Sequence, residues 1–109
     1  MDQAIDNGVV DNGTLRADLM ARIAALDVRA PYLSAAQIAP QLDAIRLLAH
    51  RGGFDPAVTV AHFLGKALGQ GDVAVHGWLA LLADAVGSEA QDLAACDAYA
   101  AACSERLAA

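Results

Sequence analysis

The chain has 109 residues and a formal net charge of -6, and 57% of its residues are hydrophobic, although only 5% are aromatic. This length suffices for one domain with a modest core of Leu, Ile, Val and Ala. The acidity argues against binding to nucleic acid or to an anionic membrane, because both require basic patches. No apolar run approaches the roughly 20 residues of a membrane span, and the N-terminus lacks a signal-peptide pattern. We therefore expect a cytoplasmic protein.

We expect residues 1–13 to form a flexible tail and residues 14–109 to form a single helical domain. The tail repeats a turn motif, Asp6-Asn7-Gly8 and Asp11-Asn12-Gly13. A helix over about 14–28 follows, with Thr14 as a plausible N-cap and Pro31 as its limit, because the residue before a proline avoids helix. Its apolar stripe recurs at three- and four-residue steps: Leu15, Leu19, Ile23 and Leu26.

A second helix is predicted from Ser34 to about Arg51. Ser34 and Gln37 have the spacing of a capping box, and Pro40 predicts a separate first turn or a kink. Gly52 and Gly53 then end the helix, and Phe54 can fold back as the hydrophobic contact of a C-cap. The buried stripe is predicted to be Ile38, Leu42, Ile45, Leu48 and Ala49.

The third helix, over 55–69, is the element around which we expect the rest of the chain to be organised. Asp55 suits an N-cap, Pro56 suits the first helical position, and Gly69 supplies the stop. One side carries an apolar stripe, so the opposite side, with His62 and Lys66, is expected to face water. The stripe comprises Ala57, Val60, Ala61, Leu64 and Leu68.

Two further helices complete the expected fold. The fourth runs from an N-cap at Asp72 to a stop at Gly87, and Ser88 with Gln91 predicts a capping box for the fifth. A heptad seam along the fifth helix comprises Leu93, Cys96, Ala100, Cys103 and Leu107. Cys96 and Cys103 are about 10 Å apart along the helix axis, too far for a disulfide, so we expect reduced core cysteines.

Short connections make successive helices antiparallel neighbours. The sequence therefore predicts an all-α fold, an antiparallel up-and-down helical bundle of four main helices plus an N-terminal helix. We expect the second to fifth helices to form the bundle and the first to lie across one end or side.

Motifs for enzymatic chemistry are not evident, so we expect no enzyme, no cofactor and no metal. The serines lie near helix ends without a nucleophile-elbow turn, and Gly69-Gln70-Gly71 lacks the strand and lysine of a phosphate loop. A metal site would require ligands at helical spacing, and His62 has a cation, Lys66, at that position. An exposed histidine on a helix is most often simply a solvated surface residue.

The group His62, Gly65 and Lys66 resembles the motif of histidine phosphotransfer (HPt) domains of two-component signalling. The family motif is His-x-x-Lys-Gly on a helix of a four-helix bundle, whereas here the glycine precedes the lysine. A second registration matches Ala49-His50 to the family's Ala-His. The resemblance implies that His62 accepts a phosphoryl group, that Lys66 neutralises it and that Gly65 leaves clearance for a partner, a receiver domain or a histidine kinase, with His50 as the reserve acceptor.

Two functions follow as expectations. The first is a small helical protein–protein interaction module, an HPt-like phosphorelay or regulatory domain that uses an exposed histidine. The alternative is a non-catalytic oligomerisation or scaffold bundle, because a heptad seam exposed in the monomer would need a partner, including a second copy of the chain. A small enzyme or ligand-binding bundle with a pocket near Trp78 and Tyr99 has less support, since aromatic residues at helical spacing are usually core.

Overall fold

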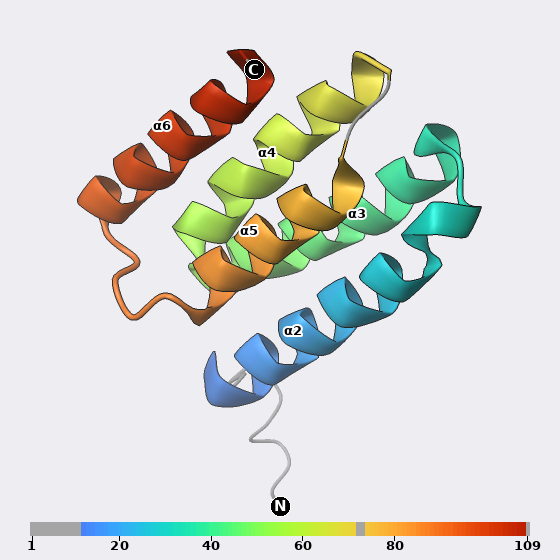
Figure 1. Ribbon diagram of the computed structural model, residues 1–109. Helices are drawn as coiled ribbons and strands as arrows, with labels where there is room; N and C mark the ends of the chain where they lie inside the picture. The colour runs from blue at the N-terminus through green and yellow to red at the C-terminus, as the bar shows by residue number, and fades with distance from the viewer. Residues whose placement is uncertain (1–11, 72–73, 109) are drawn as a thin grey trace, which may run out of the picture.

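The structure, a computed structural model, describes residues 12–71 and 74–108, and these form an all-α fold. Five α-helices and a short 3-10 turn follow one another along the chain (Figure 1): α2 (Asn12–Arg29), η1 (Ala30–Tyr32), α3 (Ala35–Arg51), α4 (Asp55–Gly69), α5 (Val75–Gly87) and α6 (Leu93–Ala108). The described residues contain no strand, and none of their helices is long and apolar enough to cross a membrane. The N-terminal tail predicted at residues 1–13 lies outside the described residues except for Asn12 and Gly13, which belong to α2.

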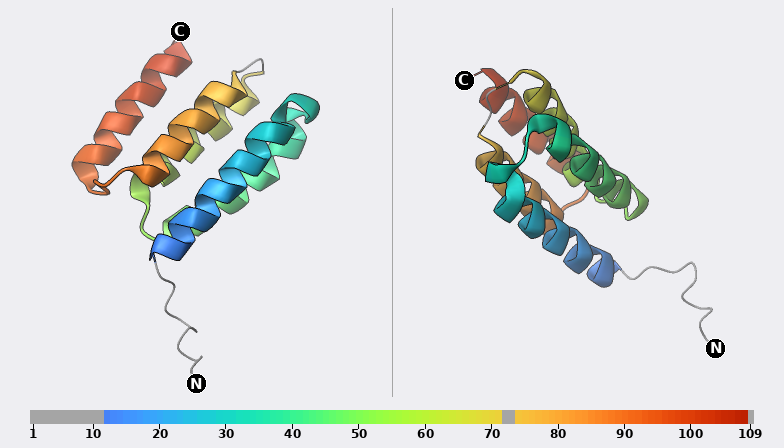
Figure 2. Two further views of the ribbon diagram at one scale, coloured as in Figure 1. Left: turned by 60° about the horizontal axis from the view of Figure 1, so that its bottom comes forward. Right: turned by 90° about the vertical axis from the view of Figure 1, so that its right-hand side faces the viewer.

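Helices α2, α3, α4 and α5 form a closed four-helix bundle in which each helix packs against the next, and α5 packs against α2. Successive helices run in opposite directions, and α5 and α2 lie in front of α4 and α3 (Figure 2). Helix α6 packs against α4 at the edge of this bundle. The expected roles of the first and last helices were therefore wrong: α2 is a bundle member, and α6 is the added helix.

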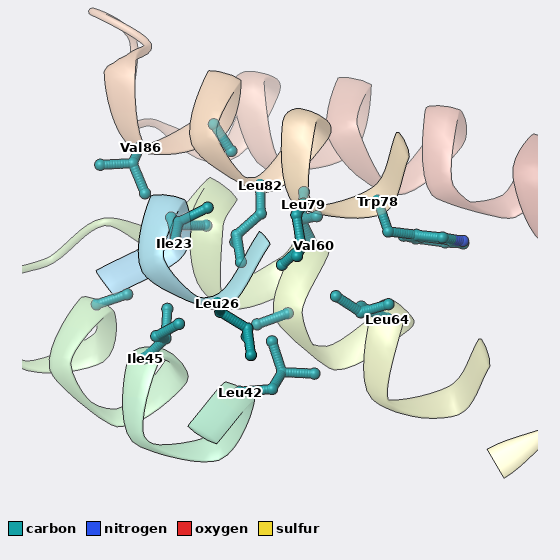
Figure 3. Packing of buried hydrophobic residues seen from close by; sticks show 14 of the residues in the cluster. Ile23, Leu26, Leu42, Ile45, Val60, Leu64, Trp78, Leu79, Leu82 and Val86 are labelled. Carbon is teal, nitrogen blue, oxygen red and sulfur yellow. The ribbon is translucent and has the colours of Figure 1, made fainter. Parts of the chain in front are cut away.

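Helix α4 is the central element, because it packs against α3, α5 and α6. Its whole predicted stripe is buried, and so are Pro56 and Ala67. Side chains from the other three bundle helices form one core cluster with those of α4, among them Leu26, Ile45 and Leu82 (Figure 3). The core is thus aliphatic with two buried aromatic residues, Phe54 and Trp78.

The two ends of α3 confirm two local predictions. At the start of α3, Ser34 Oγ accepts a hydrogen bond from the Gln37 N–H (3.2 Å), and Gln37 Oε1 accepts one from the Ser34 N–H (2.9 Å). At its end, the Phe54 N–H donates to the Ala49 carbonyl (2.9 Å), and Gly53 has φ +77°. This is a Schellman turn, and Phe54 is buried against it. Helix α3 continues through Pro40 without the separate turn that the proline had suggested.

Other helix ends differ from the predictions. Helix α2 begins at Asn12, before the predicted cap Thr14. Asp55 is the first helical residue of α4 rather than its N-cap, and its carboxylate there complements the helix dipole. The predicted cap Asp72 lies outside the described residues, and the residue that precedes α5 is Ala74.

The start of α6 shows why its predicted capping box was wrong. Asp92 caps the helix, because its Oδ1 accepts a hydrogen bond from the Ala95 N–H (3.0 Å). Ser88 and Gln91 instead stabilise the preceding connection: Ser88 Oγ donates to the Ala90 carbonyl (3.0 Å), and Gln91 Nε2 donates to the Ser88 carbonyl (2.7 Å). The helix therefore begins at Leu93, after a short non-helical segment.

The heptad seam of α6 is only partly covered. Cys103 is fully buried, whereas Leu93 is 75% exposed and Cys96 is half-buried. Both cysteines are free thiols, and burial raises the pKa of Cys103. Polar and cation–π contacts add to the attachment of this helix: Tyr99 Oη donates to Asp84 Oδ2 (2.6 Å).

Candidate functional site

His62 lies in the middle of α4 and is exposed to solvent. The periodicity of the helix explains this position, since the residues on either side in the stripe, Ala61 and Leu64, are buried. Lys66 follows one turn later and is also exposed. The structure thus brings His62, Gly65 and Lys66, the residues predicted to form the site, to one surface of α4.

This surface is one wall of a shallow hollow between α3 and α4, the α3–α4 groove, with a volume of about 660 Å³. Small and apolar residues form much of its lining, and the charged or titratable side chains come from both helices. Helix α3 contributes Ala36, Ala39, Pro40, Leu42, Asp43 and Arg46, and α4 contributes Ala61, His62, Gly65 and Lys66. A histidine and two cations therefore share one open groove.

Phe63 supports the two polar side chains of α4. Its ring meets the His62 imidazole edge to face, with centroids 5.7 Å apart and planes at 78°. The Lys66 ammonium lies 5.8 Å from the centroid of the same ring, within the range of a cation–π interaction. One half-buried aromatic ring thus restrains both His62 and Lys66 at the groove.

An ion pair from α3 forms the opposite wall. Arg46 Nη2 and Nε both donate to the same oxygen, Asp43 Oδ1, at 2.6 and 3.2 Å. The groove therefore carries the charges of Arg46, Lys66 and Asp43, a net charge of about +1 before His62 is protonated, on a chain whose formal net charge is -6. It is a locally cationic region of an acidic protein.

Gly65 leaves the α4 wall bare. A Cβ atom at this position would meet no heavy atom within 4 Å, so the glycine is not required by packing inside the molecule. Its lack of a side chain keeps the surface beside His62 open to another molecule. The predicted clearance at Gly65 is therefore physically available.

His50, the reserve acceptor, occupies a different position. It is exposed in the last turn of α3, and its carbonyl accepts the Gly53 N–H (3.1 Å) within the Schellman turn. It does not line the α3–α4 groove. The structure therefore separates His50 from Lys66 and Gly65.

His76 makes a contact that the sequence did not indicate. Its Nδ1 lies 2.8 and 3.0 Å from the two carboxylate oxygens of Asp27, on α2. The pair lies at the edge of a second hollow of about 580 Å³, between the η1 turn and the start of α5, whose other lining residues are apolar or glycine. The Asp27 carboxylate is hydrogen-bonded to one ring nitrogen of His76. By contrast, no protein hydrogen bond to the His62 ring is present among the described residues.

Arg46 and Asp43 are the residues of the groove that sequence reasoning missed. Both lie outside the predicted buried stripe of their helix, and no local signal indicated which α4 residues they would meet. Among the described residues, no group of three or more His, Cys, Asp or Glu side chains could hold a metal ion. The α3–α4 groove combines the His62 imidazole with two nitrogen cations, Arg46 and Lys66.

Comparison with protein-family models, with curated proteins and with solved structures found no match to this chain.

Proposed function

We propose that this protein is a non-enzymatic, cytoplasmic interaction module that accepts a phosphoryl group on His62 from a partner protein, a receiver domain or a histidine kinase. The observation that carries this proposal is the exposed His62 in the middle of α4, in one groove with Lys66 and Gly65. The up-and-down four-helix bundle supports it as well, because HPt domains, which the motif resembles, have this architecture.

The chemistry requires only what the groove provides. A ring nitrogen of neutral His62 attacks the phosphorus of an aspartyl phosphate on a receiver domain, and an N–P bond forms. The P–O bond to the aspartate breaks, and its electron pair leaves with the carboxylate. Lys66 offsets the negative charge on the transferred group. The reverse reaction returns the phosphoryl group to a receiver, so the module carries the group between proteins without hydrolysing it.

The experiment is incubation of the full chain with a radiolabelled phosphodonor, either a phosphorylated receiver domain or an autophosphorylating kinase. We expect acid-labile, base-stable label on wild type, and none on His62→Ala. Matched controls are His76→Ala and His50→Ala, which remove exposed histidines outside the groove and should keep the label. Label that survives His62→Ala but is lost in His50→Ala would move the acceptor to the end of α3. Absence of label with every donor tested would contradict the proposal.

Gly65→Ala separates docking from chemistry. Alanine is favoured over glycine in a helix interior by up to about 1 kcal/mol, and its methyl group meets no heavy atom within 4 Å here, so the variant should be more stable. The same methyl group occupies the surface beside His62, so we expect slower transfer from a protein donor. Gly69→Ala, at a second open glycine of α4, is the control for stability alone.

A specific observation favours the alternative, an oligomerisation or scaffold bundle. Leu93 at the start of the α6 seam is 75% exposed, and Leu47 on α3 is 47% exposed. Such side chains gain by burial against another chain. Sedimentation velocity over a wide concentration range tests this function: Leu93→Ala should reduce any self-association, and a strict monomer at the highest concentration would exclude a homo-oligomer.

A further inference from the structure

We propose that Arg46 is a second phosphate-holding cation, supplied by α3 to the oxyanion at His62, and that Asp43 holds Arg46 until the oxyanion arrives. Arg46 is a binding residue in this scheme: it contacts the phosphate oxygens and does not react. The inference rests on the proposed function only for the source of the oxyanion, since a phosphoryl group on His62 and a free phosphate present the same tetrahedral oxygens.

The first support is placement. Arg46 and Asp43 line the same groove as His62 and Lys66, from the facing helix. Lys66 lies one turn from His62 on α4 itself, so the two cations reach the groove from different helices. An oxyanion at the imidazole is therefore approached by an ammonium from its own helix and by a guanidinium from the neighbouring helix.

The second support is the geometry of the ion pair. Nε and Nη2 of Arg46 both donate to Asp43 Oδ1, so the planar fork is not matched to the two oxygens of the carboxylate. Both side chains are at the surface, with 37% and 57% of their area exposed, where such a pair contributes little. A phosphoryl group carries about -1.5 to -2 charges and three acceptor oxygens, so it can displace the single carboxylate oxygen.

The chain contains a matched control. Arg22 pairs with Asp18 on α2, with Arg22 Nε 3.2 Å from Asp18 Oδ2, and both side chains are about half exposed. Arg22 lines a separate hollow of about 230 Å³ between α2 and α3, which contains Arg29 but no histidine. Neutralising either member of this pair changes the net charge of the protein by the same amount as neutralising Arg46 or Asp43, without touching the groove.

The experiment is a titration of the full chain with inorganic phosphate at constant ionic strength, monitored by the NMR signals of the His62 ring. We expect saturable shifts at His62. Arg46→Gln removes the guanidinium donor, so it should weaken the phosphate affinity about two- to fivefold. Asp43→Asn releases Arg46 from its ion pair, so it should strengthen the affinity by a similar factor. Arg22→Gln and Asp18→Asn should leave the affinity unchanged, and Arg46→Lys should retain part of it because it keeps the charge.

Equal effects of Arg46→Gln and Arg22→Gln would overturn the inference, because only net charge would then matter. An absence of saturable shifts at His62 in wild type would also overturn it. The phosphodonor experiment decides the proposed function separately. Arg46-dependent phosphate binding without any phosphohistidine supports the inference and rejects the phosphorelay function, whereas phosphohistidine at position 62 with Arg46-independent phosphate binding does the opposite. Circular dichroism of each variant confirms that the bundle is intact.

Discussion

Helix α2 buries the whole of its predicted stripe, Leu15, Leu19, Ile23 and Leu26, whereas α6 buries one side chain, that of Cys103, among its described residues. Both helices flank the central pair α4 and α5, and both were predicted from the same three- and four-residue spacing. The seam of α6 contains alanine and cysteine where α2 has leucine and isoleucine. Spacing therefore selects the face that a helix turns inward, and side-chain size decides how much apolar area that face removes from water.

The attachment of α6 relies more on polar contacts. Tyr99 donates to Asp84 from the middle of α6, and the Arg106 guanidinium lies 5.9 Å from the centroid of the Trp78 ring near the C-terminal end of α6. Side-chain hydrogen bonds and exposed cation–π contacts each contribute about 1 kcal/mol, less than a buried leucine. We therefore expect α2 to determine global stability and α6 to open locally.

The largest expected effect is at Leu19, which is fully buried. Leu19→Ala removes apolar contacts and leaves a cavity, so it should lower the free energy of unfolding by about 3 kcal/mol. Chemical denaturation monitored by circular dichroism measures this change. The control, Leu93→Ala on exposed α6, should change the stability by less than about 0.5 kcal/mol. Equal losses would remove the distinction between the two helices.

Thiol labelling measures the opening of α6 directly. Cys103 is buried and Cys96 is half-buried, and burial also raises the pKa of Cys103, which lowers its thiolate fraction. In single-cysteine variants, Cys96→Ser and Cys103→Ala, we expect Cys96 to react about tenfold faster or more. We also expect Cys103 to react faster than global unfolding allows, through local opening. Reaction of Cys103 only at the global unfolding rate would show that α6 opens together with the bundle.

A smaller loss is expected for Tyr99→Phe, which removes the hydrogen bond to Asp84 while keeping the ring. The free energy of unfolding should fall by about 1 kcal/mol. Tyr32→Phe is the matched control, because Tyr32 is 86% exposed and should be neutral to substitution. A Tyr99 variant as stable as the control would show that the polar contact adds nothing to the attachment of α6.

The same tyrosine makes a pH-dependent contribution. Partial burial and then the hydrogen bond to Asp84 raise the pKa of Tyr99 from 10.0 to about 12. The unfolded chain therefore releases this proton first, so rising pH favours unfolding between about pH 10 and pH 12 and has no effect through this group below that range. Denaturation midpoints of wild type and Tyr99→Phe should converge across this window. Parallel curves would contradict the assignment.

Local chemistry made the bundle helices predictable. The bounds of α4, the capping box of Ser34 and the turn at Phe54 each depend on residues within one or two turns of each other. The prediction at Ser88 was wrong because two candidate caps, Ser88 and Asp92, lie close together. Which of them caps α6 depends on how long the connection must be for α6 to pack against α4. That α2 rather than α6 belongs to the four-helix bundle likewise depends on tertiary packing.

The candidate site was predictable only on one helix. The exposure of His62 and Lys66 follows from the period of α4. Arg46 comes from α3, and its position opposite His62 depends on the register between two packed helices, which no short sequence pattern encodes. The contact of His76 with Asp27 joins residues 49 positions apart and was beyond prediction for the same reason.

The two glycines at the α3–α4 corner oppose substitution for different reasons. Gly53 has a positive φ, so any other residue there strains the backbone, whereas Gly52 has an ordinary φ of -89° but no room: a methyl group would collide with Leu15 and Phe54. The obstacles at Gly52 are two side chains rather than the backbone. A methyl group at position 52 would need both the Leu15 and the Phe54 side chains to move, which couples the α3–α4 corner to the beginning of α2.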